Sequence, residues 1–209
     1  MKKYIIFDVD RTIINSYESE MISLQEAIIN VTGNGIDKTE LIKLTTLPTD
    51  QFFDNLNLSN EQINLIHKEW SNTLEKYQTI CFPGIKDVIK KLDKDGYIIG
   101  IVTSRTMDEF LELKEEFSDI MDKFKAIVTS DKVKKPKPNI ESMKYICREL
   151  KCKNEDIIYI GDSRIDWLFS INSGCTFIPA VWENKELIDI EHACLNVRDI
   201  LKVIDLINK

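Results

Sequence analysis

Long apolar runs are missing from this sequence of 209 residues. No stretch approaches the roughly 20 apolar residues that are needed to cross a bilayer, so we do not expect a membrane protein. The apolar run near the start, Tyr4–Phe7, ends at Asp8 and is far too short for the apolar region of a secretory signal peptide. We interpret it as a buried strand.

Cysteine motifs are missing as well. The cysteines are odd in number and none forms a C-x-x-C pair, which argues against a zinc site and against a disulfide framework; they are Cys81, Cys147, Cys152, Cys175 and Cys194. Reduced thiols and a cytoplasmic location are therefore expected. The two histidines are too isolated to suggest a metal site or an acid–base role.

The sequence has no excess of positive charge: 28 basic residues are outnumbered by 35 acidic ones, and the formal net charge is -7. This charge disfavours nucleic acid or an anionic membrane surface as a partner. If the substrate is itself an anion, local cations must overcome the global field, and acidic ligands that hold a metal are one way to do so. The hydrophobic fraction of 43% and the charged fraction of 30% are typical of a soluble globular protein.

Short apolar runs recur along the chain, with helical patterns between them. Each run is almost continuously apolar, as strands buried on both faces of a parallel sheet are. The predicted strands are Tyr4–Phe7, Ile98–Val102, Ala126–Val128, Ile157–Ile160 and Thr176–Ile178, with a weaker one at Cys194–Val197. Alternation of strand and helix predicts an α/β fold with a doubly wound, Rossmann-like parallel sheet.

One long segment breaks this alternation. Residues 15–80 show helical patterns, most clearly from Glu20 to Val31 and from Gln62 to Tyr77, with shorter ones at Leu41–Leu44 and Gln51–Leu56. The segment is too long for an ordinary connection between a strand and a helix. We therefore predict a helical domain of residues 16–79, inserted into a core domain of residues 1–15 and 80–209.

Polar segments follow the predicted strands, where an open α/β sheet binds its ligands. The first is Asp8-Val9-Asp10-Arg11-Thr12. Residues two apart in an extended segment point the same way, so both carboxylates can face one crevice. Two such charges are costly together unless a cation or a proton separates them. Taken alone, the segment fits an acidic loop that caps a helix equally well.

Three later segments add to the first. The hydroxyls and backbone N–H groups of Thr103-Ser104-Arg105 suit an oxyanion, although Ser and Thr also cap helices. The segment 134–138, Lys-Lys-Pro-Lys-Pro, reads most simply as a solvated basic loop, but its prolines stiffen it and can fix a lysine in place. The segment 161–166 combines a glycine turn with Asp162 and Asp166.

The order of these four segments resembles the haloacid dehalogenase-like hydrolase superfamily, and most closely its phosphoglycolate phosphatase and beta-phosphoglucomutase branch. The resemblance runs from Asp8 to Asp166, with the helical insertion at the position of the C1 cap. It implies a magnesium-dependent phosphatase that acts on a small phosphorylated metabolite, as a monomer or a homodimer. Two alternatives stay open: a sugar-phosphate mutase, and a binding or regulatory protein that has lost catalysis.

The resemblance also implies roles for single residues. Asp8 would attack phosphorus and form an aspartyl-phosphate, and Asp10 would act first as general acid and then as general base. Mg²⁺ prefers hard oxygen ligands, which would come from Asp8, Asp162, Asp166 and the backbone carbonyl of Asp10. The transferring phosphoryl group would be bound by Thr103, Ser104 and Lys135.

The helical insertion would act as a lid that excludes water and contacts the substrate. Lys43, Gln51 and Phe52 are candidates for substrate contacts only by their place in the insertion. Phe52 and Phe53 fit the core of the insertion better, and Trp70 is also expected to be a packing residue.

The sequence departs from the family pattern at Arg11, where relatives commonly have Gly, and at Asn15, where many have Asp. Since Gly tolerates unusual backbone angles, Arg11 would either alter the loop and crowd the cleft or point outward. A third interpretation is that Arg11 pairs with an anionic group of the substrate. Arg11 is also the one hint that catalysis has been lost.

Overall fold

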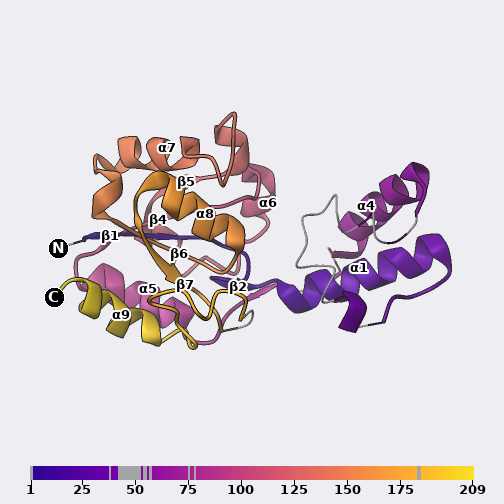
Figure 1. The fold of residues 1–209 in the computed structure, drawn as a ribbon, viewed down its shortest axis with the longest axis horizontal. Helices are drawn as coiled ribbons and strands as arrows, with labels where there is room; N and C mark the ends of the chain where they lie inside the picture. Colours follow the sequence, from indigo (N-terminus) through magenta and orange to yellow (C-terminus); the bar gives the residue numbers. More distant parts are fainter. Residues whose placement is uncertain are drawn as a thin grey trace. The chain divides into compact units, whose positions relative to one another are not determined.

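The computed structural model describes residues 2–37, 39–41, 53, 56, 58–74, 76–77, 79–182 and 185–209. The chain divides into two compact units (Figure 1): one comprises Met1–Asn15 and Ile80–Lys209, and the other comprises Ser16–Thr79. No described helix has both the length and the apolar character that a membrane span needs.

The larger unit is built on a parallel sheet with the strand order β5-β4-β1-β6-β7. Its strands are β1 (Tyr4–Phe7), β4 (Ile98–Val102), β5 (Phe124–Val128), β6 (Ile157–Gly161) and β7 (Thr176–Pro179). The predicted α/β fold with a parallel sheet is confirmed. The order reverses at β1, which lies between β4 and β6 with Tyr4 opposite both Ile98 and Ile157. Ligands of open α/β sheets bind beyond the carboxyl ends of the strands at such a reversal.

Helices cover both faces of the sheet, because successive residues of a strand point to opposite faces. Ile5 and Phe7 belong to one hydrophobic core, and Ile6 and Tyr159 belong to the other. The first core is closed by α5 (Ile85–Lys94) and α9 (Asp199–Ile207), and the second by α7 (Glu141–Leu150) and α8 (Arg164–Ser173). The short helix α6 (Met107–Leu111) follows β4, and 3-10 turns occupy Met121–Lys123, Ser130–Lys132 and Asn154–Asp156.

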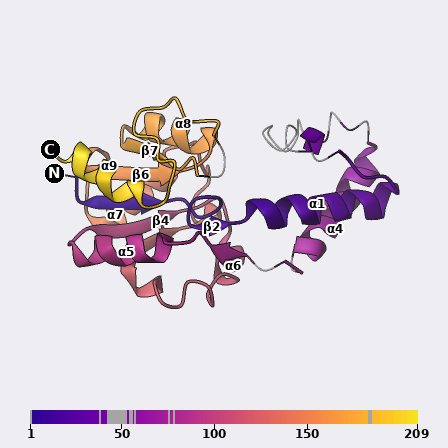
Figure 2. The same cartoon turned by 90° about the horizontal axis from the view of Figure 1, so that it is seen from below.

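Two pairings outside the main sheet complete this unit. β2 (Ile14–Asn15) and β3 (Ile80–Cys81) form an antiparallel pair at the two points where the helical unit leaves and rejoins the chain. The weak strand predicted at Cys194–Val197 is not formed: only Cys194 pairs, in an isolated bridge to Ala180, and the residues after it form bends and a turn. The two ends of the chain lie side by side (Figure 2), and the Lys2 backbone N–H donates to Asn208 Oδ1 at 2.6 Å.

The smaller unit contains α1 (Tyr17–Thr32) and α4 (Asn60–Leu74), which pack against each other. Phe53 is buried in their shared core, as expected. Trp70 also packs there, and its indole N–H donates to Ser23 Oγ at 3.0 Å. Lys43, Gln51 and Phe52 lie outside the described residues, as does most of the two short helices predicted at 41–44 and 51–56.

Candidate active site

Buried polar residues follow three neighbouring strands at the edge where the strand order reverses. Asp8 comes after β1, Thr103 after β4 and Asp162 after β6, and all three are buried. The Asp8 backbone N–H donates to Ile160 O at 2.8 Å, so the strand ladder continues to the nucleophile expected from the sequence. The parallel register therefore brings residues that are far apart in the sequence to one place.

Three carboxylates form an acidic group at this place. One ligand oxygen from each of Asp8, Asp162 and Asp166 lies within 4.8 Å of the others. Burial and the charge of Asp166 raise the pKa of Asp8 to about 7. The same two causes raise the pKa of Asp162 well above its usual value. Ionised together, these groups need a cation close by.

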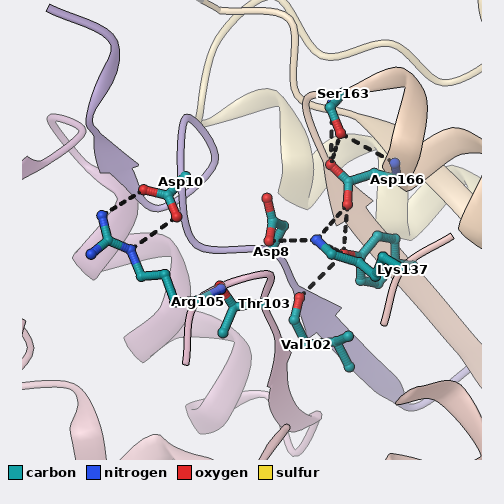
Figure 3. Close-up of polar contacts among 9 residues, drawn as sticks. Asp8, Asp10, Val102, Thr103, Arg105, Lys137, Ser163 and Asp166 are labelled. Atoms are coloured by element: carbon teal, nitrogen blue, oxygen red, sulfur yellow. Dashed lines mark hydrogen bonds and ion pairs between the residues drawn. The ribbon is translucent and has the colours of Figure 1, made fainter. Parts of the chain in front are cut away.

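Lys137 supplies one such cation (Figure 3). Its Nζ donates to Asp8 Oδ1 and to Asp166 Oδ1, each at 2.7 Å, and to the Tyr159 hydroxyl at 3.0 Å. Its side chain is 3% exposed. Burial acts to lower the pKa of Lys137, but Asp166 and Asp8 outweigh it and the pKa lies above its usual value. The lysine is therefore held in its charged form.

The lysine expected here from the sequence was Lys135, and the structure corrects that choice. Lys135 is exposed, and its backbone N–H donates to Glu141 Oε2 at 3.1 Å. The same oxygen accepts from the Lys134 N–H at 3.0 Å. Glu141 thus ties this part of the loop to the start of α7, and the next lysine along the loop, Lys137, enters the site.

Asp166 is oriented by the beginning of α8. The Asp166 N–H donates to Ser163 Oγ and the Ser163 N–H donates to Asp166 Oδ2, each at 3.2 Å, which is a capping box. The Ser163 hydroxyl also donates to Asp166 Oδ2, at 2.6 Å. The Tyr159 hydroxyl donates to Asp166 Oδ1 at 2.8 Å. Although burial acts to raise the pKa of Asp166, Lys137 and the hydrogen bonds from Ser163 and Tyr159 together outweigh it, and the pKa lies below its usual value. Asp166 is therefore a fixed carboxylate.

Gly161 allows this carboxylate to approach the strand. A Cβ atom at Gly161 would lie 2.6 Å from Asp166 Cγ, closer than two carbon atoms can pack. The glycine at the end of β6 is therefore required by the space that Asp166 occupies.

One carboxylate oxygen of Asp162 is available to bind a ligand. Its Oδ2 is buried and has no hydrogen-bond partner among the described residues. An uncompensated buried carboxylate oxygen is costly. Together with Asp8 and Asp166 it makes a set of hard oxygen donors, which suits a hard divalent cation such as Mg²⁺. The residues present therefore fit a metal at this position.

Asp10 does not join the acidic group, although the sequence placed it beside Asp8. Its carboxylate turns to Arg105 (Figure 3), which donates through Nε to Oδ2 at 2.9 Å and through Nη2 to Oδ1 at 2.8 Å. The two residues are 95 positions apart. Arg105 was not predicted as a site residue from the sequence. It could have been, because it belongs to the same polar segment after the predicted strand Ile98–Val102 that suggested Thr103.

Thr103 is buried beside this pair, and its Oγ1 accepts a hydrogen bond from the Arg105 backbone N–H at 3.1 Å. Ser104, the other hydroxyl expected to bind phosphate, is exposed. The two neighbours therefore occupy different environments, and of the two only Thr103 is enclosed at the end of β4.

Arg11 has a positive φ of 55°, in the left-handed region that glycine favours. The loop nevertheless closes, because Val9 O accepts from the N–H groups of Ile13 at 2.8 Å and Ile14 at 3.0 Å. The charge of Arg11 acts to lower the pKa of Asp162, against the larger upward effect of burial. Arg11 therefore adds positive potential to the acidic group.

Comparisons with known proteins agree with this arrangement. A family model described as haloacid dehalogenase-like hydrolase matches residues 5–180. The pyrophosphatase PpaX of Bacillus mycoides (strain KBAB4) is 24% identical, with 98% of this chain and 97% of that protein covered. The PpaX of Bacillus velezensis is 25% identical, with 87% and 84% covered.

Solved structures share the fold at low identity. A predicted phosphoglycolate phosphatase from Haemophilus somnus has a TM-score of 0.80 at 18% identity, with 97% of each chain covered. A haloacid dehalogenase-like hydrolase from Streptococcus pneumoniae also has a TM-score of 0.80 at 18% identity, with 97% of this chain and 98% of that chain covered. These likenesses establish the fold, and the family model establishes the family.

Proposed function

We propose that this chain, a phosphatase that belongs to the haloacid dehalogenase-like hydrolase family, hydrolyses a small phosphorylated metabolite. The proposed reaction uses Mg²⁺ and forms an aspartyl-phosphate on Asp8. The observation that carries this proposal is the buried acidic group. In it, Asp8 is fixed by Lys137, and Asp162 offers an oxygen with no partner among the described residues.

Asp8 is the nucleophile in this proposal. One of its oxygens forms a bond to phosphorus while the bond from phosphorus to the leaving oxygen breaks. The attacking group must be a carboxylate, whereas burial raises the pKa of Asp8 to about 7. Lys137 counters that effect at 2.7 Å and also fixes the direction of the carboxylate. A divalent cation beside Asp8 would counter it further.

Lys137 and Thr103 are suited to hold the oxygens of the transferring phosphoryl group. Charge must be stabilised there while bonds change, and donors fixed in a buried site are effective because they need no rearrangement. The Thr103 oxygen already accepts the Arg105 N–H, so the hydroxyl proton can be donated to a phosphoryl oxygen. Ser104 is exposed, and we leave it out of the proposed site.

Asp8, Asp162 and Asp166 would hold the Mg²⁺ ion. When bound, it would neutralise charge on the phosphoryl group and on the carboxylates that surround it. Asp166 is already oriented by Ser163 and Tyr159, so part of this ligand set is arranged before any ion binds.

Asp10 is proposed as the acid and base. It would give a proton to the leaving oxygen, and it would then take one from the water that attacks the aspartyl-phosphate. To do either, its carboxylate must turn away from Arg105, which now binds both of its oxygens. The lid role of residues 16–79 and the cytoplasmic location stay predictions.

The test compares the wild type with Asp8→Asn, using phenyl phosphate with and without Mg²⁺. We expect inorganic phosphate from the wild type only when Mg²⁺ is present, and none from Asp8→Asn although it folds. Asp205→Asn, an exposed carboxylate on α9, is the matched control and should keep full activity. Full activity of Asp8→Asn, or of the wild type in excess chelator, would refute the mechanism.

A second readout separates the phosphatase from the mutase alternative. With a sugar phosphate as substrate, a phosphatase releases inorganic phosphate, whereas a mutase returns an isomeric sugar phosphate. A wild type that binds phosphorylated metabolites but turns over none of them would support the noncatalytic alternative.

A further inference from the structure

The ion pair between Arg105 and Asp10 holds a second, largely enclosed cation, two residues after Thr103, which is proposed to bind the phosphoryl group. Its side chains are 17% exposed for Arg105 and 27% exposed for Asp10. Both carboxylate oxygens are bound by parallel N–H groups, at 2.9 and 2.8 Å. This two-bond geometry is the one by which a guanidinium recognises either a carboxylate or a phosphate.

Arg105 is fixed by contacts that do not involve Asp10. Its backbone N–H donates to Thr103 Oγ1 at 3.1 Å, and its carbonyl accepts from the Ser130 N–H at 2.9 Å. Its Nη1 donates to the Glu109 carbonyl at 3.3 Å. The backbone of Arg105 is thus anchored at the end of β4, and the Glu109 carbonyl is a guanidinium contact that does not depend on Asp10.

Asp10, by contrast, cannot act on the leaving oxygen while it is bound this way. Both of its oxygens are occupied, and Figure 3 shows it turned toward Arg105 and away from Asp8. If Asp10 turns into the site, Arg105 loses a charged partner in a position that is mostly closed to water. Loss of the charged partner of an enclosed ion pair is unfavourable, so an anion that takes the place of the carboxylate would favour this turn.

We propose that Arg105 determines specificity by binding an anionic group on the leaving side of the substrate, in exchange for Asp10. The substrate class is a phosphoryl compound with a second anionic group next to the scissile bond, such as a diphosphate or a phosphorylated carboxylic acid. Binding of that group releases Asp10 for its acid–base role. The inference rests on the proposed function and adds the substrate class.

The experiment compares two substrates of this class, pyrophosphate and phosphoglycolate, with phenyl phosphate, whose leaving group carries no further charge. We expect Arg105→Gln to lower kcat/KM for the first two by about 10- to 100-fold, mostly through KM, because charge-assisted hydrogen bonds are lost. For phenyl phosphate we expect a loss at least about fivefold smaller than for these two substrates, because its leaving group carries no anion for Arg105 to bind.

Two further variants separate this role from a structural one. Arg105→Lys keeps a point charge but not the two-bond geometry, so it should recover part of the lost kcat/KM. Arg164→Gln removes an exposed arginine at the start of α8 and should change none of the three substrates. An equal loss on all three substrates in Arg105→Gln would overturn the inference.

A measurement on the wild type does not depend on how the variants fold. Methylenediphosphonate, which has two phosphonate groups and resists hydrolysis, should inhibit phenyl phosphate hydrolysis at least about tenfold more tightly than methylphosphonate, at constant free Mg²⁺. Equal inhibition by the two would overturn the inference. Because phenyl phosphate is hydrolysed in that same assay, the proposed function would stand.

Discussion

Replacing Lys137 by methionine removes a buried ammonium group and keeps a side chain of similar length. In the wild type this ammonium lies 2.7 Å from an oxygen of Asp8 and 2.7 Å from an oxygen of Asp166. The variant leaves two buried carboxylates facing each other, and Asp166 keeps only the hydroxyl donors Ser163 at 2.6 Å and Tyr159 at 2.8 Å, together with the Ser163 backbone N–H, among its described donors. Lys135→Met is the matched control, two residues earlier in the same loop.

The expected size of the effect follows from burial. Removing one partner of a buried ion pair costs about 3–5 kcal/mol, and the 3% exposure of Lys137 places it in that class. The carboxylates can take up protons in response, so we expect the lower figure, about 3 kcal/mol, in metal-free protein. Lys135 is exposed, and its replacement should change stability by no more than about 0.5 kcal/mol.

Activity should separate the two lysines more sharply. Loss of one donor to a developing negative charge lowers kcat by about 100- to 1000-fold, and we expect this for Lys137→Met. For Lys135→Met we expect a change of less than about threefold. Urea unfolding gives the stabilities, and phosphate release from phenyl phosphate gives the rates. An inactive Lys135→Met beside a nearly normal Lys137→Met would show that the sequence prediction, and not the structure, selects the correct lysine.

Three further predictions concern the same site. Burial raises the pKa of Asp8 to about 7, so the stability that its protonated form contributes is present below the unfolded pKa of about 3.9 and is lost as the pH rises through 7. Mg²⁺ should therefore raise the Tm more at about pH 8, where Asp8 is ionised, than at about pH 5.5. Equal increases in Tm at the two pH values would contradict this. Gly161→Ala adds a Cβ 2.6 Å from Asp166 Cγ and should cost about 1–3 kcal/mol and weaken Mg²⁺ binding, as measured by unfolding and calorimetry; unchanged Mg²⁺ affinity would argue against this packing. Tyr159→Phe removes the hydroxyl that donates to Asp166 and should cost about 1–3 kcal/mol, whereas Tyr145→Phe outside the site should cost less; equal costs would show that the contact contributes little.

The sheet could be predicted from the sequence because its central strands are buried on both faces. Tyr4–Phe7 and Ile98–Val102 are continuous apolar runs that polar residues end, and β1 and β4 have these bounds. At the edge of the sheet the signal is weaker. β5 begins at Phe124, two residues before the predicted start at Ala126. The prediction started too late because the exposed Lys125 interrupts the apolar run. β2 and β3 have two residues each and are too short to leave a pattern.

The acidic group could be predicted for a related reason. The carboxyl ends of parallel strands meet at one edge, so residues that follow β1 and β6 must lie near each other. The choice of lysine could not be predicted this way, because Lys135 and Lys137 each precede a proline in one short loop. The structure distinguishes them through Glu141, which binds the backbone near Lys135. No spacing rule indicates which backbone N–H groups a helix-start carboxylate will bind.

A protein with a net charge of -7 can bind an anion because its cations at the site are enclosed. Lys137 is 3% exposed and Arg105 is 17% exposed, and charges shielded from water act more strongly on a ligand than surface charges do. In the described site these two cations, together with the charge of Arg11, are outnumbered by four carboxylates, those of Asp8, Asp10, Asp162 and Asp166. A divalent ion would offset that excess. The acidic residues that oppose phosphate binding in the free chain would then serve as ligands of the metal. Asp10 is the exception, because in the proposed exchange the substrate would replace it at Arg105.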